Sequence, residues 1–490
     1  MKESVVEYVS QWARQCPEKV AVIAEGAKTT YGELYRLVCG YSKYLAEAGI
    51  RKGDIVVLKA SQSIDYVVAY LAIHLSGAVV AALEKSISDE GMLKVAEQLG
   101  AKVVMADFDE PQKPYDVLYI PRNNIIACAD AQDIDDYTCT FPQKEDSADI
   151  LFTTGTTGAS KGVELSHRAL VATAENVIFG CGYKKDTVLI VPGPLNHANA
   201  IRKFFTTMVN GSTIYILNGM MNIKTFFKAL DYGGSVACCL PPSSVRMIFS
   251  LTGDKIGTYK DKIDFIESAS APLPESDKQK LCELLPNTRL YNNYGLSEAA
   301  SVCMYDYNEY QGLAGCIGKA MPNSKIIIVD EDRKEIKSSK DNMGYLACIG
   351  DVNMKGYVNE PILTKEVLID GIVYTNDLGY IDEDGFIYIS GRKGDVINVG
   401  GLKVAPTDVE DAALSYEGID DCICIPVEDN ITGKALKLLV VMGKDVPFNM
   451  KNIRNHLMSK LENYKVPRFY EQVDKIERTY NGKLNRKYYL

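Results

Sequence analysis

The most distinctive stretch of this chain reads Phe152-Thr153-Thr154-Gly155-Thr156-Thr157-Gly158-Ala159-Ser160-Lys161-Gly162. It follows an apolar strand candidate at residues 150–152. Glycines let a backbone approach a ligand closely, successive N–H groups can form an anion-binding nest, and hydroxyls and a lysine add donors and charge. The stretch therefore predicts a polyphosphate site, although its G-x-x-G-x-x-K spacing is not that of a Walker loop.

The same stretch contains a competing motif. Residues 158–162 match the G-x-S-x-G nucleophile elbow, which would make Ser160 the nucleophile of an α/β serine hydrolase. An elbow requires a helix to begin at the serine, but the next helix is expected only after Ser166, and the strand is expected to end well before Gly158. A serine hydrolase stays open as an alternative function, although the context of its motif is poor. A plain surface turn stays open as the alternative to a phosphate site.

Strands and helices alternate around this stretch. Residues 20–24 and 55–58 are apolar strand candidates, and the capping box Thr30-x-x-Glu33 predicts the start of a helix between them. The pattern recurs at residues 186–249, and such alternation with apolar strands predicts doubly wound parallel sheets. The apolar segment 67–83 is expected to be a helix, a glycine stop and a strand rather than a membrane span.

Composition limits the class of protein. The chain has 490 residues, of which 47% are hydrophobic and 24% charged, as is typical of a globular protein with about two to four domains. The net charge of −10 and the lack of a long basic run argue against nucleic acid as a partner. The thirteen cysteines show no C-x-x-C pair, so they are predicted to be reduced core residues. No signal-peptide pattern opens the chain, and a cytoplasmic location is expected.

Further polar clusters follow in order along the chain. Tyr294-Gly295-Leu296-Ser297-Glu298 combines an aromatic ring, a glycine turn, a hydroxyl and a carboxylate. Asp377 follows strand-like residues, and a carboxylate at a strand end can accept the hydroxyls of a ribose. The charged, glycine-rich residues 391–395 indicate a domain boundary, and Asn481-Gly482-Lys483 lies near the end. Each cluster alone is common in solvated loops, but their order is informative.

With these motifs in this order, the chain resembles the adenylate-forming superfamily of acyl-CoA synthetases, firefly luciferase and peptide-synthetase adenylation domains, over nearly its whole length. The resemblance implies an α/β fold. A large N-terminal AMP-binding domain, residues 1–391, would contain two doubly wound α/β subdomains and a small β-barrel. A smaller, mobile α+β C-terminal domain, residues 392–490, would follow, with the hinge near Gly394.

The resemblance also implies a role for each motif residue. The ATP phosphates would be held by Thr153, Thr154, Gly155, Thr156, Thr157, Gly158 and Lys161. AMP would contact Ser270, Ala271, Pro272, Asn293, Tyr294, Gly295, Asp377 and Arg392, with Tyr294 stacking on adenine. The acid would lie against Asn196, His197, Ser268 and Ala269. Glu298 would hold Mg²⁺, while Lys483, Ser297 and His197 would be catalytic. Asn398, Gly400 and Gly401 would form the face used in thiol transfer.

The implied reaction is ATP-dependent activation of a carboxylic acid to acyl-AMP, followed by transfer to a thiol, most commonly coenzyme A. A separate carrier protein is the alternative acceptor, and a pseudo-enzyme that only binds nucleotide is disfavoured by the intact Glu298, Asp377 and Lys483. Residues 194–199 contain His197 and no acidic residue, which favours an acid without an α-amino group. The alternative for His197 is a core histidine that caps a turn.

Overall fold

The computed structural model describes residues 2–106, 117–121, 124–134, 139–153, 161–399, 402–429, 433–478 and 484–489. Several residues predicted to be functional lie outside these ranges: Thr154, Gly155, Thr156, Thr157, Gly158, Ser160, Gly400, Gly401 and Lys483.

A seven-stranded sheet carries the strand that leads into the phosphate stretch. Its order is β18 (Gly356–Tyr357), β8 (Lys161–Ser166), β7 (Ser147–Thr153), β4 (Val79–Leu83), β3 (Ile55–Lys59), β5 (Val103–Ala106) and β6 (Leu118–Pro121). The strands from β7 to β6 are parallel, whereas β8 and β18 are antiparallel to their neighbours. The predicted doubly wound arrangement is confirmed here, and the end of β7 leaves the sheet at the edge where ligands of such folds bind.

A fourteen-stranded sheet contains the strand that ends at Tyr294 and the strand that carries Asp377. Its parallel part runs in the order β1 (Val20–Ala24), β10 (Thr213–Ile216), β9 (Thr187–Val191), β11 (Ser235–Cys239), β12 (Ile263–Ser268) and β13 (Arg289–Tyr294), with β2 (Ala27–Thr30) on the outer edge. An antiparallel part continues through β14 (Cys303–Asp306), β15 (Cys316–Ala320), β21 (Ile387–Arg392), β20 (Ile372–Ile381), β17 (Gly344–Gly350) and β16 (Ser324–Val329), and β19 (Leu368–Ile369) pairs with β20.

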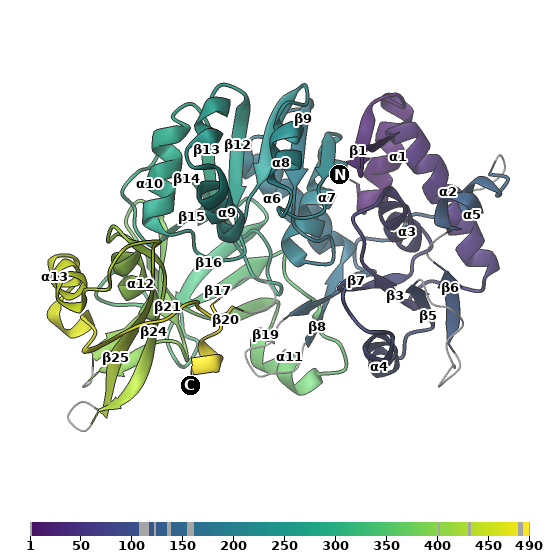
Figure 1. Ribbon diagram of the computed structural model, residues 1–490. Helices are drawn as coiled ribbons and strands as arrows, with labels where there is room; N and C mark the ends of the chain where they lie inside the picture. The colour runs from purple at the N-terminus through teal and green to yellow at the C-terminus, as the bar shows by residue number, and fades with distance from the viewer. Residues whose placement is uncertain are drawn as a thin grey trace.

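Helices cover both sheets (Figure 1). In chain order they are α1 (Val5–Gln15), α2 (Tyr31–Glu47), α3 (Ile64–Leu75), α4 (Asp89–Leu99), α5 (Ile125–Asp130), α6 (His167–Cys181), α7 (Ala198–Asn210), α8 (Ile223–Leu230), α9 (Pro242–Thr252), α10 (Glu275–Leu284) and α11 (Pro361–Val367). The predicted capping box starts α2, because the Thr30 hydroxyl accepts from the Glu33 amide and the Glu33 carboxylate accepts from the Thr30 amide. Segment 67–83 divides into α3 and β4 as expected, and no helix in the described ranges is both long and apolar enough to cross a membrane.

One hydrophobic core joins the two sheets. It contains Val163 of the first sheet, Ile214 of the second, and Tyr70, Phe204 and Phe205 from helices between them, all essentially buried. Burial of such large side chains is the main stabilising contribution to a domain of this size. The two sheets are therefore packed as one body around the ends of β7 and β13. All thirteen cysteines are unpaired, as predicted.

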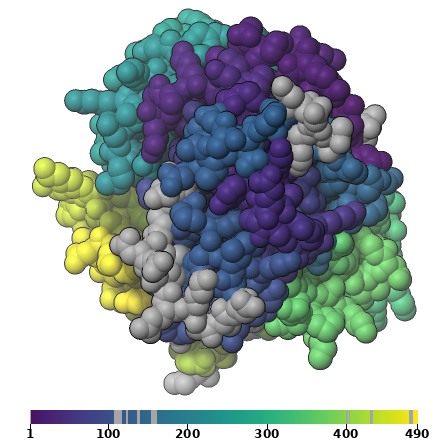
Figure 2. All heavy atoms as spheres, turned by 90° about the vertical axis from the view of Figure 1, so that its right-hand side faces the viewer, coloured from purple at the N-terminus to yellow at the C-terminus, as the bar shows by residue number. Residues whose placement is uncertain are grey.

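The C-terminal module, defined here as the residues after Gly394, has its own core. It contains β22 (Ile397–Val399), β23 (Leu402–Val404), α12 (Pro406–Leu414), β24 (Ile419–Asp429), β25 (Gly433–Met442), α13 (Met450–Lys460) and β26 (Phe469–Gln472). It lies on the left in Figure 1, and in Figure 2 its yellow residues emerge at the left edge of a face covered by N-terminal residues. A separate cluster that includes Val409 and Leu438 packs α12 onto β24 and β25.

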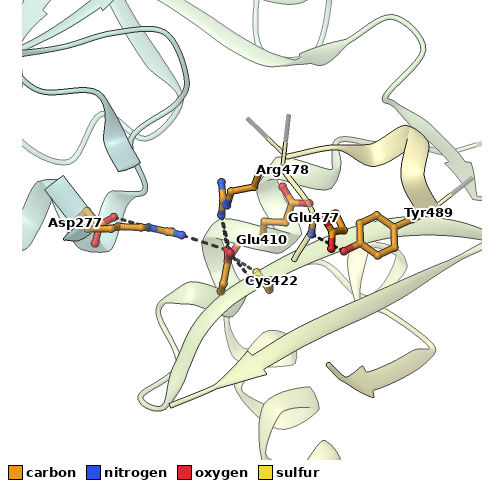
Figure 3. Close-up of polar contacts among 8 residues, drawn as sticks. Asp277, Glu410, Cys422, Glu477, Arg478 and Tyr489 are labelled. Atoms are coloured by element: carbon orange, nitrogen blue, oxygen red, sulfur yellow. Dashed lines mark hydrogen bonds and ion pairs between the residues drawn. The ribbon is translucent and has the colours of Figure 1, made fainter. Parts of the chain in front are cut away.

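One arginine connects the C-terminal module to the rest of the chain (Figure 3). Arg246 of α9 places Nε 3.2 Å from Asp277 Oδ2 on α10 and Nη1 3.3 Å from Asp421 Oδ1 on β24. Asp421 is also held by Arg478, whose Nη2 lies 2.8 and 2.7 Å from its two carboxylate oxygens. A chain of three charged contacts therefore runs from α10 to the residues just before position 479.

Candidate active site

A cavity of about 610 Å³ lies where the two sheets and the antiparallel strands meet. Nine residues predicted from the sequence line it: Lys161, His197, Ala269, Ser270, Asn293, Gly295, Ser297, Glu298 and Arg392. They come from β8, the N-cap of α7, β13, the turns after β12 and β13, and β21. Asn196, Ser268, Ala271, Pro272, Tyr294, Asp377 and Asn398 are not among its lining residues, and the side chain of Thr153 lies outside the described part.

Glu298 is the carboxylate of this cavity. Its Oε1 accepts a hydrogen bond from the Tyr357 hydroxyl at 2.6 Å, and Lys161 Nζ lies 5.6 Å from the centre of the Tyr357 ring. Burial, and then the negative charge of Glu298, raise the pKa of Tyr357 well above its ordinary value, so the phenol stays a donor at neutral pH. Tyr357 orients one oxygen of Glu298, and sequence reasoning missed it because it lies 59 positions away.

A Mg²⁺ ion prefers hard oxygen ligands, and a carboxylate at the cavity wall fits this preference. In the described ranges no group of three or more His, Cys, Asp and Glu side chains is placed to hold a metal ion. The donor set on this chain therefore suits an ion that takes one carboxylate from Glu298 and its other ligands from phosphate oxygens and water.

Asp377 is paired from two directions. The Tyr294 hydroxyl donates to Oδ2 at 2.5 Å, and Arg392 Nε lies 3.4 Å from Oδ1. Asp377 and Arg392 are direct cross-strand partners on β20 and β21, so the sheet register itself brings these two predicted residues together. Burial, and then the charge of Asp377, raise the pKa of Tyr294, which keeps the hydroxyl protonated. In this structure Tyr294 supports Asp377 through its hydroxyl, while stacking on adenine stays a prediction.

Arg202 of α7 holds the turn after β13 in place through hydrogen bonds. Sequence reasoning also missed this residue. Its Nη1 donates to the Leu296 carbonyl and its Nη2 to the Ser297 carbonyl, both at 2.9 Å. Arg202 is 8% exposed, and burial lowers its pKa to about 10. At Gly295 a Cβ atom would lie 2.3 Å from the Ser301 amide nitrogen, so only glycine allows this turn to close. Gly295 and Arg202 together hold Ser297 and Glu298 against the cavity.

His197 caps a helix and also lines the cavity, but it is half-buried rather than part of the core. It is the N-cap of α7, its Nδ1 accepts from the Asn199 amide at 3.4 Å, and it also lines the cavity. Opposite it, Ser270 adopts a φ of 80°, a strained backbone position of the kind that occurs at ligand-binding turns. The N-terminus of α7 and the turn after β12 thus face the same space.

The residue predicted to act in catalysis near the C-terminus, Lys483, lies outside the described ranges, but both sides of its segment are anchored. Arg478 binds Asp421 through both carboxylate oxygens, as shown in Figure 3. Arg486 binds both oxygens of Glu410, at 2.6 and 2.7 Å. Each arginine makes two charge-assisted hydrogen bonds to one carboxylate, so both sides of this segment are held on the module.

The hydrolase alternative conflicts with the local fold. β7 ends at Thr153, β8 begins directly after Ser160 at Lys161, and the two strands form an antiparallel pair. The following helix, α6, begins at His167, as predicted, and not at the serine. A nucleophile elbow needs a strand, a sharp turn and a helix in immediate succession, so the G-x-S-x-G match does not identify a nucleophile here.

Comparisons with known proteins identify the family. Residues 9–358 match the family model for AMP-binding enzymes, and residues 408–483 match that for the AMP-binding enzyme C-terminal domain. The chain belongs to the AMP-binding enzyme family. It is 26% identical to a 2-succinylbenzoate–CoA ligase from Geobacillus sp. (strain WCH70), covering 99% of this chain and 97% of that protein. It is 25% identical to a 4-coumarate–CoA ligase-like protein from Arabidopsis thaliana, covering 99% and 93%.

Solved structures share the fold. ATP-bound MatB from Rhodopseudomonas palustris superposes with a TM-score of 0.87 at 23% sequence identity, covering 100% of this chain and 99% of that one. The predicted family, the α/β fold class, ATP-dependent activation of an acid and the ligase class are confirmed. The domain boundary at residue 391 and the roles of individual site residues stay predictions.

Proposed function

We propose that this protein is an AMP-forming acyl-CoA synthetase for a carboxylic acid without an α-amino group. The observation that carries the proposal is the meeting of Lys161, Glu298 and Arg392 at one cavity, from segments far apart in the sequence. Relatives named as CoA ligases that match almost the whole chain support coenzyme A as the thiol. Unpaired cysteines support a cytoplasmic location, where thiols stay reduced.

The first step needs charge neutralisation rather than a general base. The substrate carboxylate is already a nucleophile at neutral pH, and its oxygen forms a bond to the α-phosphorus while the bond to the bridging oxygen of pyrophosphate breaks. Lys161 and the phosphate stretch would hold the β- and γ-phosphates, and Lys483 would bind the carboxylate and the α-phosphate. Mg²⁺ at Glu298 would supply further positive charge when bound. Asp377, aligned by Tyr294 and Arg392, would accept the ribose hydroxyls.

The second step transfers the acyl group. The thiol sulfur of coenzyme A attacks the acyl carbon, and AMP leaves from the mixed anhydride. Residues 392–490 would turn about Gly394 between the steps and bring Asn398, Gly400 and Gly401 toward the cavity. Gly394 has a φ of 98°, which a glycine adopts without strain. The lack of an acidic side chain in residues 194–199 supports an acid without an ammonium group next to its carboxylate.

The experiment is pyrophosphate exchange over a panel of carboxylic acids, with and without coenzyme A. Acid-dependent exchange together with acyl-CoA formation is expected. Exchange without acyl-CoA, but with loading of a phosphopantetheinyl carrier protein, would select the carrier alternative. Failure of every acid would refute the proposal. Lys483→Ala should abolish pyrophosphate exchange but have a smaller effect on hydrolysis of a preformed adenylate. Ser160→Ala tests the hydrolase alternative, and it should leave any esterase activity unchanged.

A further inference from the structure

A buried ion pair lies directly behind the α7 side of the cavity. Lys203 Nζ of α7 lies 2.5 Å from Glu267 Oε1 of β12, and the two side chains are 1% and 0% exposed. Asn293 of β13 donates to the same Glu267 oxygen at 2.5 Å and to the Ser301 hydroxyl at 3.1 Å. We call these residues the polar wall: Lys203, Glu267, Asn293 and Ser301.

The polar wall is not fully satisfied by its own contacts. Glu267 Oε2 and Asn293 Oδ1 are buried, and neither has a hydrogen-bond partner in the described part of the chain. Buried acceptors are nearly always paired, and a buried ion pair is seldom more stabilising than apolar residues of the same volume. Packing alone therefore does not explain this set of residues, whereas a ligand that donates a hydrogen bond would.

Two residues of the polar wall lie where the acid is expected. Asn293 and Ser301 line the cavity beside His197 and Asn199, at the N-terminus of α7. Asn293, whose side-chain nitrogen donates to Glu267, thus lines the same cavity as His197 and Ala269, the residues expected to hold the acid.

The charges around the polar wall decide which donor fits. Lys203 balances Glu267, so the buried pair carries no net charge. A ligand ammonium would add an unbalanced positive charge beside Lys203, and a second carboxylate would face two acceptor oxygens. An uncharged donor avoids both penalties.

Building on the proposed function, we infer that the acid carries an uncharged hydrogen-bond donor, a hydroxyl or a primary amide, which donates to the polar wall. A purely apolar acid would leave the acceptors unpaired in the activated complex. Sites built to bind a substrate hydroxyl reject analogues without it far more strongly than apolar pockets reject an extra methylene. The substrate class is thus hydroxy or amide acids rather than plain fatty acids or unsubstituted aryl acids.

The test compares acids that differ in one terminal group. Straight-chain and benzoate series are assayed by pyrophosphate exchange, each with a methyl, hydroxyl, carboxamide, ammonium or carboxylate group at matched positions. In the best series, kcat/KM is expected to be at least about tenfold higher for the hydroxyl or carboxamide member than for the methyl member. Preference for the methyl, ammonium or carboxylate member would overturn the inference while leaving adenylation intact. Absence of exchange with every acid would instead refute the proposed function.

A pair of substitutions ties the preference to the polar wall. Lys203→Met with Glu267→Gln removes the two charges together and keeps their volume, so neither partner is left as an isolated buried charge. The hydroxyl-to-methyl ratio of kcat/KM should fall about tenfold or more. Asn293→Leu should lower the same ratio. An unchanged ratio in either folded variant would refute the inference.

A control of the same residue types lies on α10, where Lys278 and the more exposed Glu275 form another ion pair at 2.7 Å whose residues do not line the cavity. Lys278→Met with Glu275→Gln should leave the hydroxyl-to-methyl ratio unchanged. A drop of the same size in this control would show that the ratio reports general loosening rather than the polar wall. Thermal unfolding of each variant establishes that the compared proteins are folded.

Discussion

Replacing Arg246 with methionine is expected to loosen the docking of the C-terminal module while leaving each module folded. The methylene stem and its packing are kept, but the contact between Arg246 and Asp421 is lost. Asp421 stays paired with Arg478, but Asp277 of α10 also loses its contact with Arg246. The perturbation therefore acts on the interface between the modules and on the α9–α10 contact, and the Asp277→Asn control separates the two effects.

The size of the effect follows from burial. Arg246 and Asp421 side chains are 27% and 21% exposed, between a surface pair and a buried one. Surface pairs contribute about 0.2–1 kcal/mol, and hydrogen bonds to charged groups about 1.5–3 kcal/mol. A loss of about 1–2 kcal/mol is expected for the docked arrangement. Since 1.4 kcal/mol corresponds to a tenfold change in an equilibrium constant, the population of the docked arrangement relative to other arrangements should fall about 5–30-fold.

The assay separates the two half-reactions. Pyrophosphate exchange follows adenylation, and transfer from preformed acyl-AMP to coenzyme A follows thioester formation. The half-reaction that uses this docked arrangement should slow about 5–30-fold, and the other should not slow. Asp421→Asn and the double variant complete a mutant cycle, and Asp277→Asn is the control because Asp277 contacts Arg246 from its own domain. A coupling energy below about 0.3 kcal/mol, or equal loss in both half-reactions, would refute the reasoning.

Three further predictions concern pH, metal and hinge. Burial, followed by the charge of Glu275, raises the pKa of Asp411 on α12 to about 7, above its value of about 4 in the unfolded chain. The contribution of the protonated Asp411 to the free energy of unfolding is therefore complete below pH 4 and lost as pH rises through about 7. Thermal unfolding should thus occur at lower temperature at pH 8 than at pH 6. Asp411→Asn should reduce this difference between the two pH values. Glu298→Gln should keep the hydrogen bond from Tyr357 but raise the Mg²⁺ concentration for half-maximal exchange by roughly tenfold, and an unchanged titration would exclude Glu298 as a ligand. Gly394→Pro cannot adopt the observed φ of 98°, so at least one half-reaction should slow, and wild-type rates of both would remove Gly394 as the pivot.

The parts of the site that were predictable are those encoded locally. The phosphate stretch follows β7, Tyr294 ends β13 and Asp377 lies on β20, and polar residues at strand ends or in a glycine turn stand out against apolar neighbours. The meeting of Lys161, Glu298 and Arg392 at one cavity could be expected from family motifs in the right order, although Tyr294 and Asp377 are not among its lining residues. The pairing of Asp377 with Arg392 depends on strand register, which the motifs alone do not specify.

The supporting residues could not be predicted in this way. Arg202 and Lys203 are neighbouring charges on α7, and charges on a helix normally indicate a solvated face, yet both are buried. Their partners, the carbonyls of Leu296 and Ser297 and the carboxylate of Glu267, come from segments more than sixty positions away. Only the tertiary fold brings these groups together, and it does so by placing α7 between the two sheets.

The position of β1 has a consequence for the order in which the chain folds. Its one parallel partner is β10, and Thr213 donates a hydrogen bond to the Val20 carbonyl across 193 sequence positions. During synthesis at about 5–20 residues per second, the first thirty residues therefore wait roughly 10–40 s before their edge of the sheet exists. The capping box at Thr30 can form α2 in that interval, because its contacts are local. The hairpin of β1 and β2 thus joins the edge of the large sheet late in folding, although it leaves the ribosome first.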